Sequence, residues 1–122
     1  MVQSRIDDHD IRLQVVFFRT ERGSEPVREW LKSLPLDEKR IIGEDIKTVQ
    51  FGWPLGMPIV RKMEPGLWEV RSRLVDRIAR VLFTVMDNKM VLLHGFIKKS
   101  DKTPQDDLRM AHQRLAQLRG EK

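Results

Sequence analysis

The 122-residue sequence predicts an α+β domain, in which an N-terminal strand and a helical hairpin pack on an antiparallel sheet that is followed by a C-terminal helix. Three observations support this prediction. Apolar residues recur at helical spacing between positions 26 and 52, four short apolar runs separated by tight turns occupy positions 59–97, and helical spacing returns after position 103. We expect the helices to cover one face of the sheet.

The first strand is expected at Leu13–Phe18, a β-branched and aromatic run. Ser24 is the expected N-cap of the next helix, with Pro26 in its first turn, where a missing N–H is tolerated. Pro35 ends that helix. Its apolar face contains Val27, Trp30, Leu31 and Leu34.

A second helix begins near Asp37 and Glu38 and ends at Gly52 and Pro54. Ile42, Ile46 and Val49 lie on one side of it. The short break between the two helices favours an antiparallel hairpin.

Four strands follow, joined by the turns EPG, LVDR and DN. They are Ile59–Met63, Leu67–Arg73, Ile78–Met86 and Met90–Ile97. Thr103 and Pro104, followed by two aspartates, mark the start of the last helix. The apolar stripe of this helix is Leu108, Ala111, Leu115 and Leu118.

The turns also predict the register of the sheet. A two-residue loop at Asp87–Asn88 places Arg80 opposite Gly95. A four-residue loop in the preceding hairpin places Arg71 opposite Arg80, whereas a three-residue loop would place Arg71 opposite Ala79.

Side chains alternate between the two faces of a sheet. One face is therefore an expected core of Trp68, Val70, Ala79, Val81, Phe83, Val85, Leu92, His94 and Phe96. The other face collects Glu69, Arg71, Arg73, Arg80, Leu82, Thr84 and Gly95. On this register His94 is more readily a core histidine than a catalytic one.

Two opposed arginines beside a glycine have two interpretations. In the first, they form an open anion-binding site, because a glycine has no side chain and an anion can approach its backbone. Alternatively Glu69, Asp76 or a helix carboxylate neutralises them.

Composition restricts the function. The net charge of +5 favours an anionic partner, nucleic acid first and an acidic protein second, over a merely solubilising surface. The chain has no cysteine, so disulfides, thiolate zinc sites and cysteine nucleophiles are excluded, and a reducing cytoplasm is compatible. We expect one domain over residues 1–122, with 1–12 flexible or peripheral, no signal peptide and no membrane span.

Four segments in order carry a resemblance: PVREWLKSL, GLWEVR, the downstream Arg80, and LHGFIKKSDKTP. In these the chain resembles the RelE/HigB superfamily of toxin–antitoxin toxins, in particular its phage-derived host-inhibition branch, from about Phe17 to Leu115. The resemblance implies a RelE-like fold and a ribosome-dependent mRNA endonuclease that needs no metal or cofactor. It also implies a co-encoded antitoxin, often with a helix-turn-helix domain, and the ribosome and its mRNA as partners.

The resemblance places catalytic roles on Arg71, Arg80, Lys98 and Lys99. RNA contacts are expected from Arg61, Lys62, Arg73 and Lys102. Several relatives have a tyrosine near the C-terminus, and this chain has none. Phe96 or Trp53 could replace it for stacking but not for proton transfer.

Cleavage of RNA through its 2′-hydroxyl needs a base, an acid and stabilisation of a phosphorane. Arginine stays protonated, so Arg71 and Arg80 suit the phosphorane. Crowding of Lys98, Lys99 and Lys102 favours a neutral amine for proton transfer; the alternative is a solvated turn that follows the phosphate backbone.

Two other functions stay open: a toxin of the same fold directed at another target such as gyrase, and a non-catalytic RNA-binding module. The low aromatic content of 7% and the absence of an RNA-binding aromatic motif argue against the module.

Overall fold

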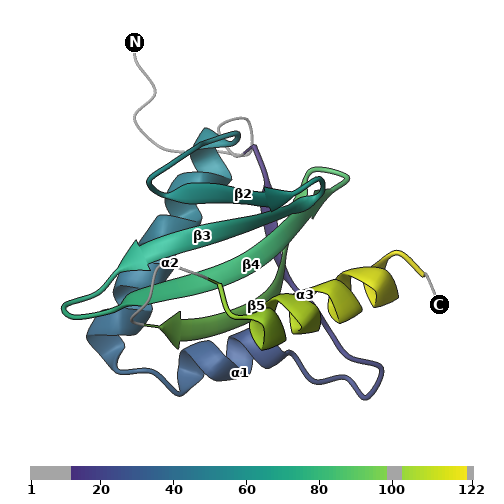
Figure 1. The fold of residues 1–122 in the computed structure, drawn as a ribbon, viewed down its shortest axis with the longest axis horizontal. Helices are drawn as coiled ribbons and strands as arrows, with labels where there is room; N and C mark the ends of the chain where they lie inside the picture. Colours follow the sequence, from purple (N-terminus) through teal and green to yellow (C-terminus); the bar gives the residue numbers. More distant parts are fainter. Residues whose placement is uncertain (1–11, 99–102, 121–122) are drawn as a thin grey trace, which may run out of the picture.

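The structure, a computed structural model, describes residues 12–98 and 103–120 (Figure 1). The predictions for the segment before Arg12 and for Lys99 and Lys102 lie outside the described residues. The elements are β1 (Gln14–Phe17), α1 (Pro26–Lys32), α2 (Leu36–Gly52), β2 (Val60–Glu64), β3 (Leu67–Arg73), β4 (Ile78–Met86), β5 (Lys89–Lys98) and α3 (Gln105–Leu118). The predicted α+β class and element order are confirmed.

The described strands form one five-stranded sheet in the order β1-β5-β4-β3-β2. β2 to β5 are an antiparallel meander, as predicted. β1 lies parallel to β5, so the sheet is mixed rather than antiparallel. The connection from β1 passes through α1 and α2 before the chain returns to the sheet, which permits the parallel pairing.

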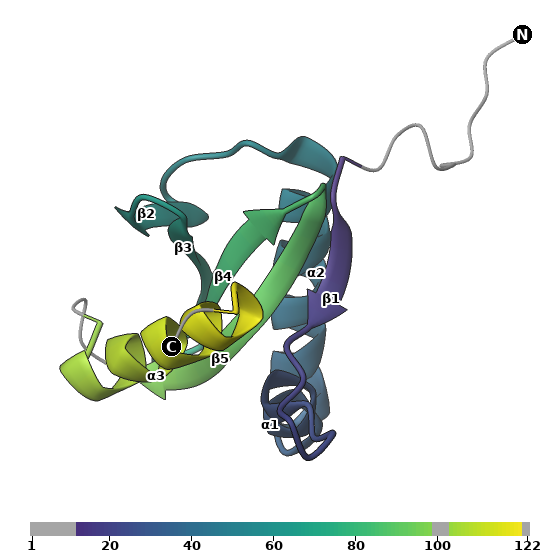
Figure 2. The same ribbon diagram turned by 90° about the vertical axis from the view of Figure 1, so that its right-hand side faces the viewer.

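Helices cover both faces of the sheet, so the prediction of one covered face was wrong. Figure 2 shows α1 and α2 on one side of the strands and α3 on the other. The α1/α2 face buries a cluster that includes Val27, Ile42, Val70 and Phe83. The α3 face buries a second cluster, which is formed by Phe18, Leu67, Leu82, Val91, Leu93, Phe96, Ala111 and Leu115.

The predicted register between β3 and β4 is confirmed, with Arg71 opposite Arg80 and Arg73 opposite Ile78. The β4–β5 hairpin also begins as predicted, with Met86 opposite Lys89. Asp87 and Asn88 form its loop with φ values of 50° and 63°, the left-handed conformation that two-residue hairpins require.

A bulge then changes the register. It lies between Leu82 and Phe83 on β4, opposite an extra residue, Leu93, on β5. Beyond it Arg80 lies opposite Phe96, not Gly95, and Val81 lies opposite Gly95.

Because one extra residue reverses the alternation, His94 and Phe96 lie on the α3 face and Gly95 on the α1/α2 face. The predicted faces of these three residues were therefore wrong. A Cβ built on Gly95 would lie 2.4 Å from two ring carbons of Trp30, so the glycine admits an α1 side chain rather than an anion.

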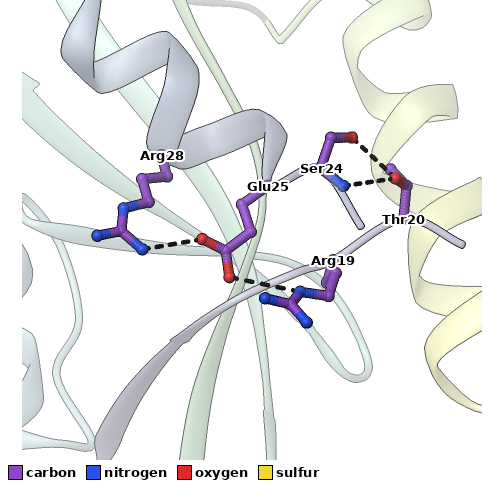
Figure 3. A network of polar contacts seen from close by, with 5 residues as sticks. All are labelled: Arg19, Thr20, Ser24, Glu25 and Arg28. Atoms are coloured by element: carbon purple, nitrogen blue, oxygen red, sulfur yellow. Dashed lines mark hydrogen bonds and ion pairs between the residues drawn. The ribbon is translucent and has the colours of Figure 1, made fainter. Parts of the chain in front are cut away.

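The loop before α1 is held by contacts that differ from the predicted N-cap. Glu25 occupies the N-cap position and makes no side-chain cap. Ser24 bonds to Thr20 instead, with 2.8 Å between the two hydroxyl oxygens (Figure 3). Glu25 receives a hydrogen bond of 3.1 Å from Arg28, and its other carboxylate oxygen is 3.8 Å from Arg19 Nε.

Among the described helices, none combines the length and the apolar character that crossing a membrane would require.

Candidate functional site

Arg71 and Arg80 face each other on the α3 face of the sheet. The Arg71 N–H donates to the carbonyl of Ile59, 2.8 Å away, so the backbone polar groups of Arg71 point to the β2 side. Arg71 and Arg80 are therefore a non-hydrogen-bonded pair, in which Cα atoms are only about 4.5 Å apart and side chains are closest. Two positive charges at this spacing require a counter-charge.

Glu69 supplies that charge. One carboxylate oxygen is 3.7 Å from Arg71 Nη1 and the other is 3.7 Å from Arg80 Nη1. The side chains of Glu69 and Arg80 are 0% exposed, and that of Arg71 is 15% exposed. The interpretation that a carboxylate neutralises the arginines is thus observed, and the pair is a buried ion-pair network with Arg71 at its outer end.

Thr103 closes the network from the α3 side. Its hydroxyl donates to Glu69 Oε2 at 2.6 Å and accepts from Arg80 Nη1 at 3.3 Å. Pro104, not Thr103, occupies the N-cap position of α3. Thr103, which the sequence predicts as a helix start, therefore connects the beginning of α3 to β3 and β4.

The other predicted site residues are distributed unevenly. Arg61 lies opposite Glu69 and shares the α3 face, and the exposed Arg73 extends the same row. Lys98 is exposed on that face at the end of β5, opposite Ile78. Lys62 lies opposite Trp68 and points to the α1/α2 side, so the structure separates it from the others.

His94 is held between β5 and α3. Its Nε2–H donates to Asp107 Oδ1 at 2.7 Å, and its Nδ1 is 3.4 Å from Arg114 Nη1. Arg114 also donates to the carbonyl of Leu93 at 2.8 Å, and burial lowers its pKa from the ordinary arginine value. Both ring nitrogens of His94 thus face protein groups in this structure.

Both aromatic candidates for base stacking pack against other rings. Phe96 is buried and stacks on His94, with ring centroids 5.7 Å apart. Trp53 packs edge-on against Trp68 at 4.9 Å on the α1/α2 face.

A cavity of about 400 Å³ lies beside Arg71, at the sheet edge where β2 begins. It is lined by Asp45, Met57, Pro58, Ile59, Arg71, Arg73 and Ile78. Within residues 12–98 and 103–120, the side chains of Asp45 and Arg73 make no hydrogen bond or ion pair. The cavity therefore presents a carboxyl group and a guanidinium group that are not paired with each other.

Sequence reasoning missed Thr103, Asp107 and Asp45 as site residues. Thr103 and Asp107 resembled helix-start residues, and only the face of α3 that meets the sheet reveals their other contacts. Asp45 belongs to a helix with many charges, and no spacing signal connects it to β3.

In the parts of the chain that the structure describes, no group of three or more His, Cys, Asp or Glu side chains could hold a metal ion. The family model described as Phage derived protein Gp49-like (DUF891) matches residues 29–116, from α1 into α3. No curated protein matches the chain.

Proposed function

The chain belongs to the phage-derived Gp49-like family, which is associated with toxins of toxin–antitoxin systems, and from this premise we propose that it is such a toxin and acts as a ribosome-dependent mRNA endonuclease. One observation carries the proposal: the buried network of Glu69, Arg80 and Thr103 fixes Arg71 at the border of an open cavity. A guanidinium held in this way suits a phosphate, because its planar donors match two phosphate oxygens.

The proposed reaction is cleavage through the neighbouring 2′-hydroxyl. The 2′-oxygen loses its proton and forms a bond to phosphorus, the bond from phosphorus to the 5′-oxygen breaks, and that oxygen takes up a proton. The products are a 2′,3′-cyclic phosphate and a 5′-hydroxyl. Arg71 stabilises the charge of the phosphorane, and the charge it supplies does not depend on a metal ion.

Arg80 belongs to this site as a positioning residue. Its side chain is fully buried, and its Nη1 is close to Glu69 and Thr103. Its positive charge beside Arg71 requires the Glu69 carboxylate as a counter-charge, and that carboxylate in turn orients Arg71. The direct contact with the reacting phosphate is assigned to Arg71.

Proton transfer is assigned to Lys98, the last residue of β5, and to the next residue in the sequence, Lys99. Lys98 is exposed on the same face as Arg71, and Lys99 lies outside the described residues. His94 is less suited, since Asp107 and Arg114 face its two nitrogens. Arg61, Arg73 and Lys102 are proposed to contact the RNA backbone; Lys62 would do so only from the opposite face.

The proposed setting is the cytoplasm, where ribosomes and mRNA are available. We propose that a co-encoded antitoxin with a helix-turn-helix domain inhibits the chain by covering the α3 face around Arg71. That face carries the basic residues on which an acidic antitoxin segment could bind.

The burial of Arg80 and Glu69 also fits a second candidate. In a toxin of the same fold that acts on gyrase, the network would stabilise the sheet and have no role in RNA cleavage. The two candidates differ in what they do to RNA and to supercoiled DNA.

The test uses purified ribosomes programmed with a defined mRNA, the same mRNA alone, and a gyrase supercoiling assay. We expect cuts in the ribosome-bound message, an intact free message and unimpaired gyrase. Inhibited gyrase with intact mRNA on the ribosome would replace the proposal by the second candidate.

A further inference from the structure

Two of the charged side chains that line the cavity at the edge of β3 have no charge partner within the described ranges. Arg71 and Arg73 line one part of it and Asp45 another. Asp45 and Arg73 make no hydrogen bond or ion pair within the described ranges. An anion alone would meet Asp45, and a cation alone would meet the arginines, so a fitting ligand has both a negative group and hydrogen-bond donors.

The remaining lining is apolar, and its backbone is hydrogen-bonded to β3 at Ile59. Met57, Pro58 and Ile59 precede β2, and the Ile59 carbonyl accepts the Arg71 N–H at 2.8 Å. Met57 is 62% exposed, so its side chain is accessible to a ligand at the mouth of the cavity. Together with Ile78 these residues provide an apolar wall on which a planar ring can lie, in a volume typical of small-molecule sites.

We propose that this cavity binds a nucleobase of the RNA next to the cleaved bond, and that Asp45 selects a base with donors on its Watson–Crick edge, guanine best. This inference rests on the proposed function and extends it to base preference. The nucleotide's phosphate contacts Arg71 and Arg73, its ring lies on the apolar wall, and its edge reaches Asp45. Single-stranded RNA is commonly recognised through such splayed bases.

The preference follows from the chemistry of a carboxylate, which only accepts hydrogen bonds. Guanine offers two adjacent donors, the N1–H and the N2 amino group, which match both oxygens. Adenine and cytosine offer one amino group. Uracil offers one imino N–H between two carbonyl oxygens, which a carboxylate repels.

The test is a titration of the purified full-length chain with guanosine and uridine 5′-monophosphates, followed by amide resonances in two-dimensional NMR. We expect shifts at Asp45, Ile59 and Arg73, and a dissociation constant at least about fivefold lower for the guanine nucleotide. Asp45→Asn should reduce the difference to less than about twofold.

Glu44→Gln is the matched control, because it removes the same charge from the neighbouring, exposed position of α2. It should keep the wild-type preference. Thermal melting of both variants checks that each is folded. Equal affinities in the wild type, no binding of either nucleotide at millimolar concentration, or an unchanged preference in a folded Asp45→Asn would overturn the inference.

These results are independent of the ribosome. If the chain fails to cut mRNA but binds the guanine nucleotide through Asp45, the nuclease proposal falls and the pocket stands. If it cuts mRNA with a base preference that Asp45→Asn leaves unchanged, the pocket assignment falls and the nuclease stands.

Discussion

At the scale of single residues, Arg71 is the most informative position. It is the outer member of a network whose inner members, Glu69 and Arg80, are fully buried. In a buried network, unlike an exposed arginine pair, the removal of one charge leaves a partner buried with less compensation, which destabilises the fold.

Arg71→Ala should fold and lose activity. Loss of one preorganised donor to transition-state charge lowers the rate by about 100- to 1,000-fold. The melting temperature should fall only slightly, because Glu69 keeps Arg80 and Thr103 as partners when Arg71 is removed. Cleavage of ribosome-bound mRNA and thermal melting measure the two effects.

The control for this variant is Arg109→Ala, which removes the same charge from the exposed surface of α3, where Arg109 pairs only with the exposed Asp106 among described residues. It should stay active. Full activity in Arg71→Ala, or equal losses in the two variants, would refute a specific role of Arg71.

Glu69→Gln should be the most destabilising conservative change in the site. The substitution leaves two close guanidiniums without their carboxylate, and loss of one partner of a buried ion pair costs about 3–5 kcal/mol. Denaturant unfolding of Glu69→Gln, Arg80→Met and the double variant measures the coupling. The double variant should be less destabilised than the sum of the single ones, and simple additivity would contradict a buried network.

At the scale of elements, the features that were predictable from the sequence are those that depend on residues close together in the chain. The Asp87–Asn88 loop and the LVDR loop specify their hairpins, and the opposition of Arg71 and Arg80 follows from the second of these. The bulge at Leu93 could not be predicted, because Val91, Leu92 and Leu93 are apolar at successive positions and offer no alternation from which a slipped register can be recognised.

The second covered face did leave a signal. Leu82 and Leu93 are apolar where a solvent-facing row would be polar, and both are fully buried under α3. A strand that is apolar at nearly every position is typical of a sheet covered on both sides. The contacts of Thr103 with Glu69, by contrast, depend on where α3 docks, which no local pattern contains.

Gly95 provides the test at this scale. Gly95→Ala places a methyl group 2.4 Å from the Trp30 ring, so α1 must shift, and overpacking of this kind costs about 1–3 kcal/mol. Gly43→Ala is the matched control, since the same methyl group meets nothing within 4 Å in the middle of α2 and should stabilise the helix by up to about 1 kcal/mol.

Thermal unfolding of the two glycine variants should therefore shift in opposite directions. If Gly95→Ala is as stable as the wild type, Trp30 does not pack on this glycine, and the face assigned to it here is wrong.

At the scale of the whole molecule, the sheet divides the protein into two functions. The α1/α2 face buries the larger apolar cluster and supports the fold. The α3 face combines a smaller cluster with four basic side chains, Arg61, Arg71, Arg73 and Lys98. This division is the reason why we place RNA, and the antitoxin that competes with it, on the α3 face.

The most direct test of this account is the mapping of mRNA 5′ ends in cells after induction of the chain without its antitoxin, with the wild type and Arg71→Ala in parallel. The account predicts growth arrest by the wild type, with new 5′ ends inside translated frames that disappear in a folded, ribosome-bound Arg71→Ala. Growth arrest with intact transcripts and a DNA-damage response would contradict it.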